Sequence, residues 1–486
     1  MNKYSLQLMR AWGTYGARFL PFADAATADL PLSRLLRLSL FQVSVGMALV
    51  LLIGTLNRVM IVELEVPASL VGIMISLPLL FAPFRALIGF RSDTHRSELG
   101  WKRVPFIWKG TLIQFGGLAI MPFALLVLSG GGNAAQAPVW IGRLGAGIAF
   151  LLVGAGLHMT QTVGLALATD LAPEESQPKV VGLMYVMLLV GMIASALLFG
   201  AALVEFTPKR LVQVIQGAGL ATMVLNTFAL WKQEPRGQRR RGQSSTADLT
   251  FAQAWAAFSS GDRAIRRLVA VGIGTMAFSM EDVLLEPYGG QILHLTVGAT
   301  TRLTATLAIG GLLGFGLASR VLSRGFDPFR MASVGALVGI PAFLCVIIAA
   351  PAQSALLFAS GTLLIGFGAG LFGHGTLTAT MNRAPADQRG LALGAWGAVQ
   401  ASAAGLAVAM SGVIRDTVTA AAAGRDLLPG VSAATAGYST VYSLEIALLG
   451  LTVLAMAPLV IRVGHAAGSR PASVLAVASP DAFERR

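Results

Sequence analysis

Twelve long apolar runs constrain this sequence more than any other feature. A helix that crosses the hydrocarbon of a bilayer needs about 20 predominantly apolar residues. Runs of that kind lie at 38–60, 67–90, 104–128, 139–169, 178–204, 209–231, 266–288, 298–322, 328–350, 354–381, 388–414 and 438–463. Lipid offers backbone N–H and C=O groups no partner, so such runs must be helices or cavity-lining breaks in helices. The sequence therefore predicts an all-α membrane protein with twelve transmembrane helices.

The positions of the basic residues predict how these helices are oriented. The net charge is +13, yet only 12% of the residues are charged and 55% are hydrophobic, which excludes a soluble nucleic-acid-binding protein. With twelve spans, we assign 27 Lys and Arg residues, including those at the ends of the runs, to the termini and the connections on their side, against 4 on the opposite side. Basic residues mark cytoplasmic connections and suit an anionic inner leaflet. We therefore expect a multi-pass protein of a bacterial inner membrane, with both termini cytoplasmic.

A shift of 212 residues reveals an internal repeat. The shift aligns Gly154 with Gly366, Gly156 with Gly368, Pro173 with Pro385, Gly182 with Gly394 and Gly200 with Gly412. We predict an N-terminal interfacial arm (1–37), a six-helix half (38–231), a basic cytoplasmic linker (232–265), a second six-helix half (266–464) and a cytoplasmic tail (465–486). Two parallel six-helix repeats joined by such a linker resemble the plan of the major facilitator superfamily.

The connection after the second run supports this resemblance. Gly89 is followed by Asp93, Arg96 and further basic residues, which resembles the superfamily's signature between its second and third helices. The resemblance implies that Asp93 caps a neighbouring helix and pairs with basic residues to hold a closed state. A solvated charged loop explains the same residues, so both interpretations stay open here.

Ionisable residues inside the runs are the first candidates for a functional site, because each is costly unless it is paired or hydrated. Seven of them fall in the half that is predicted to be periplasmic: Arg58, Arg143, Glu281, Asp282, Glu286, Arg302 and Glu445. One hypothesis is a gate held shut by ion pairs, in which Arg58 pairs with Glu281 or Asp282. A second is a proton-coupling acid, with Glu281 or Asp282 partly protonated by burial. A third is a static clamp between the halves.

Two histidines lie inside apolar runs that are rich in glycine. His158 lies in the fourth run and His374 in the tenth, and the repeat aligns His158 with Gly370, about one helical turn from His374. A neutral imidazole is a suitable axial ligand for the magnesium of a chlorophyll-type ring, and glycines would let a flat macrocycle approach the backbone. These three residues are therefore candidates for pigment binding. The alternative is that the histidines are hydrogen-bonded packing residues and the glycines serve helix contact.

The sequence gives no indication of an enzyme. It contains no phosphate-binding glycine loop followed by Lys, no zinc-ligand spacing and no nucleophile elbow, so we expect neither catalytic residues nor a metal site. Its single cysteine, Cys345, lies within a run and excludes a disulfide framework.

Five segments carry a resemblance to one family. They are 31–42, 54–60, 83–93, 100–108 and 281–290, and together they resemble the PucC/LhaA family, the bacteriochlorophyll-delivery branch of the major facilitator superfamily. The resemblance implies an assembly factor of photosynthetic membranes that supplies bacteriochlorophyll, as cargo, to light-harvesting antenna polypeptides during their insertion. It also implies contacts with membrane lipid and with pigment-synthesis and insertion machinery. Without this resemblance, the sequence predicts a proton-coupled facilitator-type transporter of a small amphipathic solute.

Overall fold

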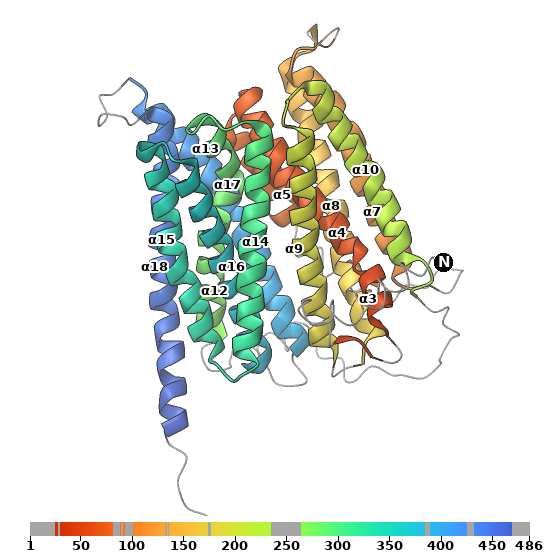
Figure 1. Ribbon diagram of the computed structural model, residues 1–486, viewed down its shortest axis with the longest axis vertical. Coiled ribbons are helices and arrows are strands. Elements are labelled where there is room, and N and C mark those ends of the chain that lie inside the picture. The colour runs from red at the N-terminus through yellow and green to blue at the C-terminus, as the bar shows by residue number, and fades with distance from the viewer. Residues whose placement is uncertain are drawn as a thin grey trace, which may run out of the picture.

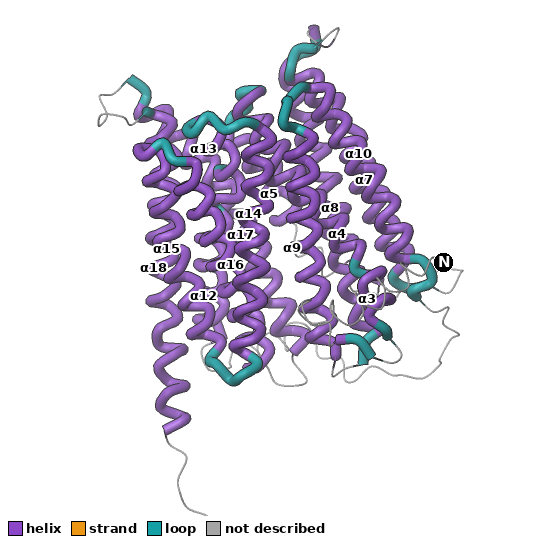
Figure 2. Tube along the Cα trace, in the orientation of Figure 1, coloured by secondary structure: helices purple, strands orange, loops and turns teal. Residues whose placement is uncertain are grey.

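A computed structural model describes residues 25–27, 30–80, 88, 91–92, 101–131, 134, 136–173, 176–234, 264–383, 389–424 and 432–468. These residues form a bundle of long helices without a strand (Figures 1 and 2). Eleven segments are long and apolar enough to cross a membrane, and a shorter apolar helix, Ala68–Leu80, lies at the position of the predicted second span. The all-α fold with twelve membrane helices is confirmed.

The first half of the chain contains six of these spans. The first span, Leu32–Glu63, joins α3 (Leu32–Leu38), α4 (Leu40–Leu49) and two π-helical segments, η3 (Val50–Leu56) and η4 (Val59–Glu63). It is followed by α5 (Ala68–Leu80), α7 (Val104–Leu128), α8 (Val139–Leu171), α9 (Gln177–Ala202) and α10 (Pro208–Leu230).

The second half begins with a broken span. The seventh span, Ala264–Gln291, consists of α12 (Ala264–Ser279), a 3₁₀ turn η7 (Glu281–Val283) and α13 (Leu285–Gln291). It is followed by α14 (Val297–Leu322), α15 (Pro328–Ala352), α16 (Ala355–Arg383), α17 (Arg389–Ala422) and α18 (Ala433–Gly468). We call the lower end of the bundle in Figure 1, where α3 lies, the linker end, and the opposite end the far end.

Small residues bring the two halves together along two seams near the far end. On one seam, α5 meets α17, and a Cβ added to Gly72 would lie 2.7 Å from the Val408 carbonyl oxygen. On the other, α9 meets α14, and a Cβ added to Gly298 would lie 2.7 Å from the carbonyl oxygen of Gly200. Because lipid tails are as apolar as the helices, such close backbone packing is a main source of attraction between membrane helices.

At the linker end, the carboxylate of Glu234 caps the start of α7. It accepts hydrogen bonds from the backbone N–H groups of Lys102, Arg103 and Val104 at 2.6–3.1 Å, and these are groups that the helix itself leaves without partners. The Arg103 side chain pairs with Asp170 at 2.9 Å and also donates to Ser92. The predicted motif residues Gly89, Asp93 and Arg96 lie outside the described residues.

Candidate functional site

The seventh span breaks just before a proline. Pro287 has no N–H and its ring clashes with the carbonyl group four residues earlier, which kinks or breaks a helix there. The chain therefore leaves α12 at Ser279, passes through the turn Glu281–Val283 and resumes as α13 at Leu285. The break leaves the carbonyl oxygen of Val283 without its usual partner in the helix.

Asn57 of the first span satisfies this carbonyl. Its Nδ2 donates to the Val283 oxygen at 2.9 Å and lies 3.5 Å from the Asp282 oxygen, while it also donates to the Ile53 oxygen of its own helix. The Asn57 side chain is fully buried. A side chain of the first half thus holds the broken backbone of the second half in place, a role that the sequence pattern does not predict for it.

The π-helical winding of the first span sets which acid lies beside the Arg58 side chain. In a π-helix, residues five apart are hydrogen-bonded, and the chain places Glu63 beside Arg58, with Nη1 and Oε1 2.6 Å apart. The second guanidinium nitrogen, Nη2, donates to the Leu295 carbonyl oxygen of the other half at 3.1 Å. The predicted ion pair of Arg58 with Glu281 or Asp282 is wrong: among the described residues, its carboxylate partner is Glu63 on its own helix.

Two glycines let the first and seventh spans approach each other closely. Glu286 lies against Gly54 of the first span, where any side chain would meet its carboxylate, and it accepts a hydrogen bond from the Thr304 hydroxyl. In return, the guanidinium of Arg58 lies over Gly290 of the seventh span. The first span therefore supplies Arg58 and the glycine that accommodates Glu286. The seventh span supplies Glu286 and the glycine that accommodates Arg58.

A buried carboxyl cluster lies at the break, and we define it as Glu281, Asp282, Glu286 and Glu445. Glu281 and Glu286 are only 3% and 4% exposed, and Glu445 of α18 is fully buried beside Glu281 and Asp282. Burying a carboxylate without a countercharge is costly. No group of three or more His, Cys, Asp or Glu within the described ranges is arranged to hold a metal ion.

Tyrosines enclose this cluster from the side of α18. The Tyr288 ring of α13 contacts those of Tyr438 and Tyr442 edge to face, with centroids 5.4 and 5.5 Å apart. The Tyr438 hydroxyl donates to Gln291 at 2.8 Å. Sequence analysis missed these tyrosines, although the spacing of 438, 442 and 445 places all three on one face of a helix.

A polar contact between α17 and the other half lies beside the tyrosines. Arg415 donates to Gln291 at 2.6 Å, pairs with Asp416 at 2.8 Å and lies 4.8 Å above the Tyr438 ring. Asp416 in turn accepts the backbone N–H of Ser69, at the start of α5, at 2.8 Å. This network ties the seventh span to the seam between α5 and α17.

Two of the predicted charged residues do not join the cluster. Arg143 is exposed near the start of α8, and the structure gives it no ion pair with a described acid. Arg302 of α14 lies against Gly200 of α9, with Nη2 3.5 Å from the Gly200 carbonyl oxygen. Arg302 therefore belongs to the seam between α9 and α14.

The glycines near the two histidines mostly serve helix packing. A Cβ on Gly370 would lie 2.5 Å from the Gly311 carbonyl oxygen, so the backbone of α14 fills the space where a macrocycle was expected to approach. The space beside Gly156, near His158, is filled in the same way by the backbone of α7. Gly373 differs, because nothing lies within 4 Å of a Cβ added there. Its neighbour His374 is half-buried, with its ring centroid 4.3 Å from that of Phe315.

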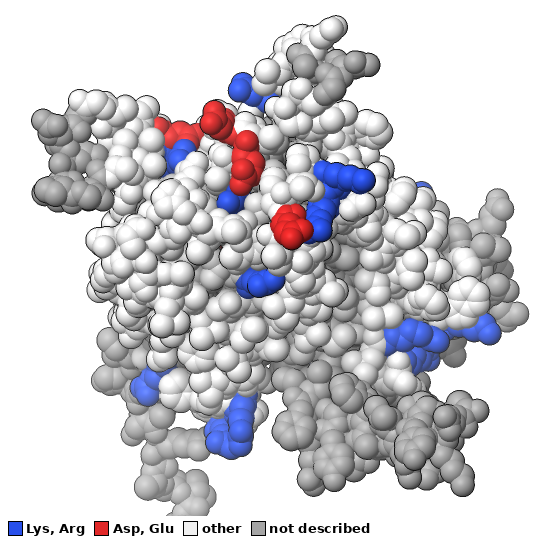
Figure 3. All heavy atoms as spheres, turned by 45° about the horizontal axis from the view of Figure 1, so that its top comes forward, with Lys and Arg blue, Asp and Glu red and all other residues white. Residues whose placement is uncertain are grey.

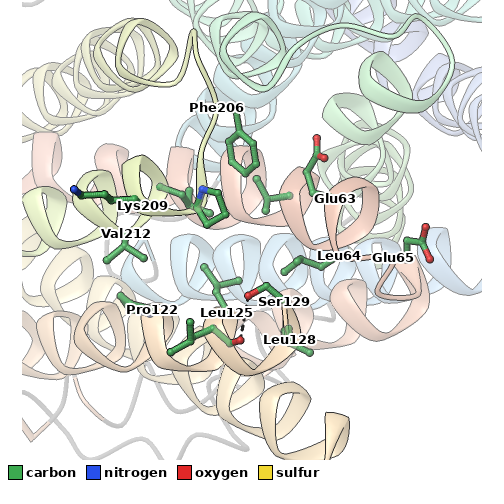
Figure 4. A pocket seen from close by; sticks show the side chains of 14 residues that line it. Glu63, Leu64, Glu65, Pro122, Leu125, Leu128, Ser129, Phe206, Lys209 and Val212 are labelled. Atoms are coloured by element: carbon green, nitrogen blue, oxygen red, sulfur yellow. Dashed lines mark hydrogen bonds between the residues drawn. The ribbon is translucent and has the colours of Figure 1, made fainter. Parts of the chain in front are cut away.

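An apolar groove of about 580 Å³ opens at the far end of the first half. It is lined by the end of the first span, by the end of α7 around Pro122 and Leu125, and by the start of α10. Figure 4 shows Lys209 at one end of the groove and Glu63 and Glu65 at the other. Seen obliquely from the far end, the surface carries a small group of acidic and basic side chains on largely uncharged ground (Figure 3).

Comparison with known proteins adds to these observations. The chain matches the family described as PUCC protein over residues 55–464. A protein named Protein PucC from Rhodovulum sulfidophilum is 65% identical over 86% of this chain and 92% of its own length. Another Protein PucC, from Cereibacter sphaeroides, is 58% identical over 91% and 95%. A bacterial homolog of the human lysosomal transporter Spinster, in an inward-facing and unoccupied conformation, aligns with a TM-score of 0.64 at 15% identity, covering 87% of this chain and 95% of that one. This structural likeness concerns the fold alone and confirms the predicted major facilitator plan.

Proposed function

The chain belongs to the PUCC protein family, and from this premise we propose that it is an assembly factor for light-harvesting complexes that delivers bacteriochlorophyll to antenna polypeptides as they insert. Its family and fold are those of transporter-like membrane proteins and not of enzymes. The observation that carries the proposal is the family match over residues 55–464. It covers three of the five segments that carry the resemblance in full, and a fourth, 54–60, from residue 55.

Pigment binding by this chain centres on His374. His374 is half-buried, packs against Phe315 and adjoins the open space at Gly373. Gly156, near His158, and Gly370 both pack against neighbouring helices, so the geometry favours His374 over His158 as the residue nearest the ring. The chain's own contribution is an imidazole nitrogen to orient the pigment and an aromatic side chain to cover it.

The partners in this proposal are the antenna polypeptides, the surrounding membrane lipid, and the enzymes and insertion machinery that supply pigment and polypeptide. The basic linker and both termini lie on the cytoplasmic side, where newly made polypeptides enter the membrane. The membrane is the inner, photosynthetic membrane of a bacterium.

The test compares pigment bound to purified protein with the antenna content of cells. Wild-type protein from a pigment-producing host is expected to carry bacteriochlorophyll, seen in its absorption spectrum, and deletion of the gene is expected to deplete one antenna complex. His374→Gly is expected to lose most of the pigment and to regain it with added imidazole, which can occupy the vacated space. His158→Ala, the matched control, is expected to retain it.

Two outcomes would count against the proposal at different levels. Pigment retained by His374→Gly without imidazole would remove His374 from the site but leave delivery intact. Protein without pigment, together with a normal antenna in the deletion strain, would contradict delivery. That result would favour a proton-coupled transporter of a small amphipathic solute, the function that the fold alone suggests.

A further inference from the structure

Several oxygen atoms of the carboxyl cluster are buried without a hydrogen-bond partner. They are Oε2 of Glu281, Oε2 of Glu286 and both carboxyl oxygens of Glu445. The backbone N–H of Glu281 points toward Glu445 but does not meet hydrogen-bond geometry. Buried polar groups in folded proteins are nearly always satisfied, so a group of this size requires an explanation.

A second, independent observation points to the same place. The Tyr442 hydroxyl is fully buried, has no hydrogen-bond partner, and faces Glu445 and Glu281. A hydroxyl can both donate and accept a hydrogen bond. The Tyr442 oxygen is therefore available to contact a ligand that is held between the carboxyl groups.

The neighbouring cations are already engaged. The elements packed around the cluster present these ionisable groups: Arg58 and Glu63 from the first span, Tyr288 from α13, Arg415 and Asp416 from α17, and Tyr438 from α18. Arg58 pairs with Glu63, although it also acts on Glu286, and Arg415 pairs with Asp416. Glu281, Asp282 and Glu445 therefore have no cation of their own among the described residues, and the cation near Glu286 is shared with Glu63.

A bound monovalent cation would remove this imbalance. Broken membrane helices commonly expose backbone carbonyls that coordinate Na⁺ or lie beside a proton-binding acid, and the seventh span breaks within the cluster. A divalent ion fits less well, because the part of the chain that the structure describes has no three-residue ligand group.

We propose that the carboxyl cluster binds a monovalent cation, a proton or a sodium ion, between the broken seventh span and α18. The cluster exchanges this cation when the two halves separate near the far end. Glu281, Glu286 and Glu445 are buried, and the contacts of Asn57 with Val283 and of Arg58 with Leu295 join the two halves at the same span. We therefore expect water to reach these acids when those contacts open. This inference does not depend on the pigment that the protein delivers.

The test uses the full chain in lipid nanodiscs, without pigment, and compares wild type with Glu445→Gln. Infrared difference spectroscopy detects protonated carboxyl groups, and equilibrium binding of radioactive sodium detects a bound ion. If the cation is a proton, wild type shows a protonated-carboxyl band that Glu445→Gln loses and that sodium leaves unchanged. If it is sodium, wild type binds about one ion per chain, releases protons on binding, and loses at least tenfold in affinity in Glu445→Gln.

Controls separate the cluster from other acids. Glu205→Gln changes an exposed carboxylate at the same end, paired with Arg210, and is expected to behave as wild type. If Glu445→Gln does not fold, Tyr442→Phe takes its place, with a shifted carboxyl band or a tenfold weaker sodium affinity expected. A wild-type protein with neither a protonated carboxyl band nor bound sodium would overturn the proposal, as would an effect of Glu205→Gln equal to that of Glu445→Gln.

Discussion

The first and seventh spans are the first helices of the two halves. Where they meet, both depart from a regular α-helix, in different ways. The first stays continuous and widens into π-helical turns around Asn57 and Arg58. The seventh is interrupted just before Pro287, which cannot donate a hydrogen bond to the Val283 carbonyl. One span thus presents side-chain donors, and the other presents carboxyl groups and exposed carbonyls.

This difference shows that the first and seventh spans are complementary to each other. The donors of the first span, Asn57 and Arg58, meet the Val283 and Leu295 carbonyl groups of the second half. A regular seventh helix would engage the Val283 carbonyl in its own hydrogen bonds, whereas the Leu295 carbonyl lies in the connection before α14. The irregularity of one span is therefore stabilised by that of the other.

The largest expected effect tests which carboxylate holds Arg58. Arg58→Ala removes a 4% exposed guanidinium from Glu63 and from the Leu295 carbonyl. The free energy of unfolding is expected to fall by about 3 kcal/mol, the lower part of the range for a broken buried pair, because Glu63 reaches water. Denaturant unfolding in detergent micelles measures this. A double-mutant cycle should show coupling of Arg58 to Glu63 and little to Asp282, and the reverse would contradict the assignment.

An intermediate effect tests why Asn57 is present. Asn57→Ala leaves the Val283 carbonyl without a partner, which is expected to cost about 2 kcal/mol of unfolding free energy. In a Pro287→Ala background, the restored N–H of residue 287 can bond that carbonyl within the helix. The same Asn57→Ala change should then cost less than about 1 kcal/mol. An equal cost in both backgrounds would show that Asn57 acts elsewhere.

The smallest effect separates two neighbouring tyrosines. Tyr438→Phe removes the hydroxyl that donates to Gln291, and the free energy of unfolding is expected to fall by about 1 kcal/mol. Tyr442→Phe is the comparison, because its buried hydroxyl has no partner in the protein. Measured without sodium, its loss is expected to cost less than the loss of the Tyr438 hydroxyl. The same unfolding measurement compares the two variants. A larger loss for Tyr442→Phe would mean that its hydroxyl is bonded in the folded protein.

The sequence predicts the spans well because length and hydropathy decide them. A run of about 20 apolar residues has one stable state in lipid, and the structure has a membrane helix at each predicted run. The ends are less predictable. The first span begins at Leu32, six residues before the predicted boundary at residue 38, because Arg34 and Arg37 interrupt the hydropathy without interrupting the helix.

The sequence predicts which residues belong to the site better than it predicts which of them contact each other. Glu281, Asp282, Glu286 and Glu445 are recognisable as costly intramembrane acids. The structure brings Glu445 beside Glu281 and Asp282, while Glu286 faces Gly54 and Thr304. The partner of Arg58 was not predictable, since hydropathy does not reveal a π-helical turn that brings residues five apart together. Gly370 was assigned to a pigment because a glycine allows close approach to any surface, and sequence alone does not say that α14 occupies it.

The π-helical winding of the first span also bears on how such a chain can change by insertion and deletion. Each hydrogen bond between residues five apart encloses one residue more than an α-helical bond does. A single-codon deletion between Arg58 and Glu63 would remove that extra residue and restore ordinary winding, so the parts of the helix on either side would keep their orientation. Arg58 and the acid would then be four residues apart, about one turn of an α-helix, and Asn57 and Arg58 would still face the other half. The π-helical segment can therefore lose one codon without the turn of about 100° that the same loss would cause in a regular membrane helix.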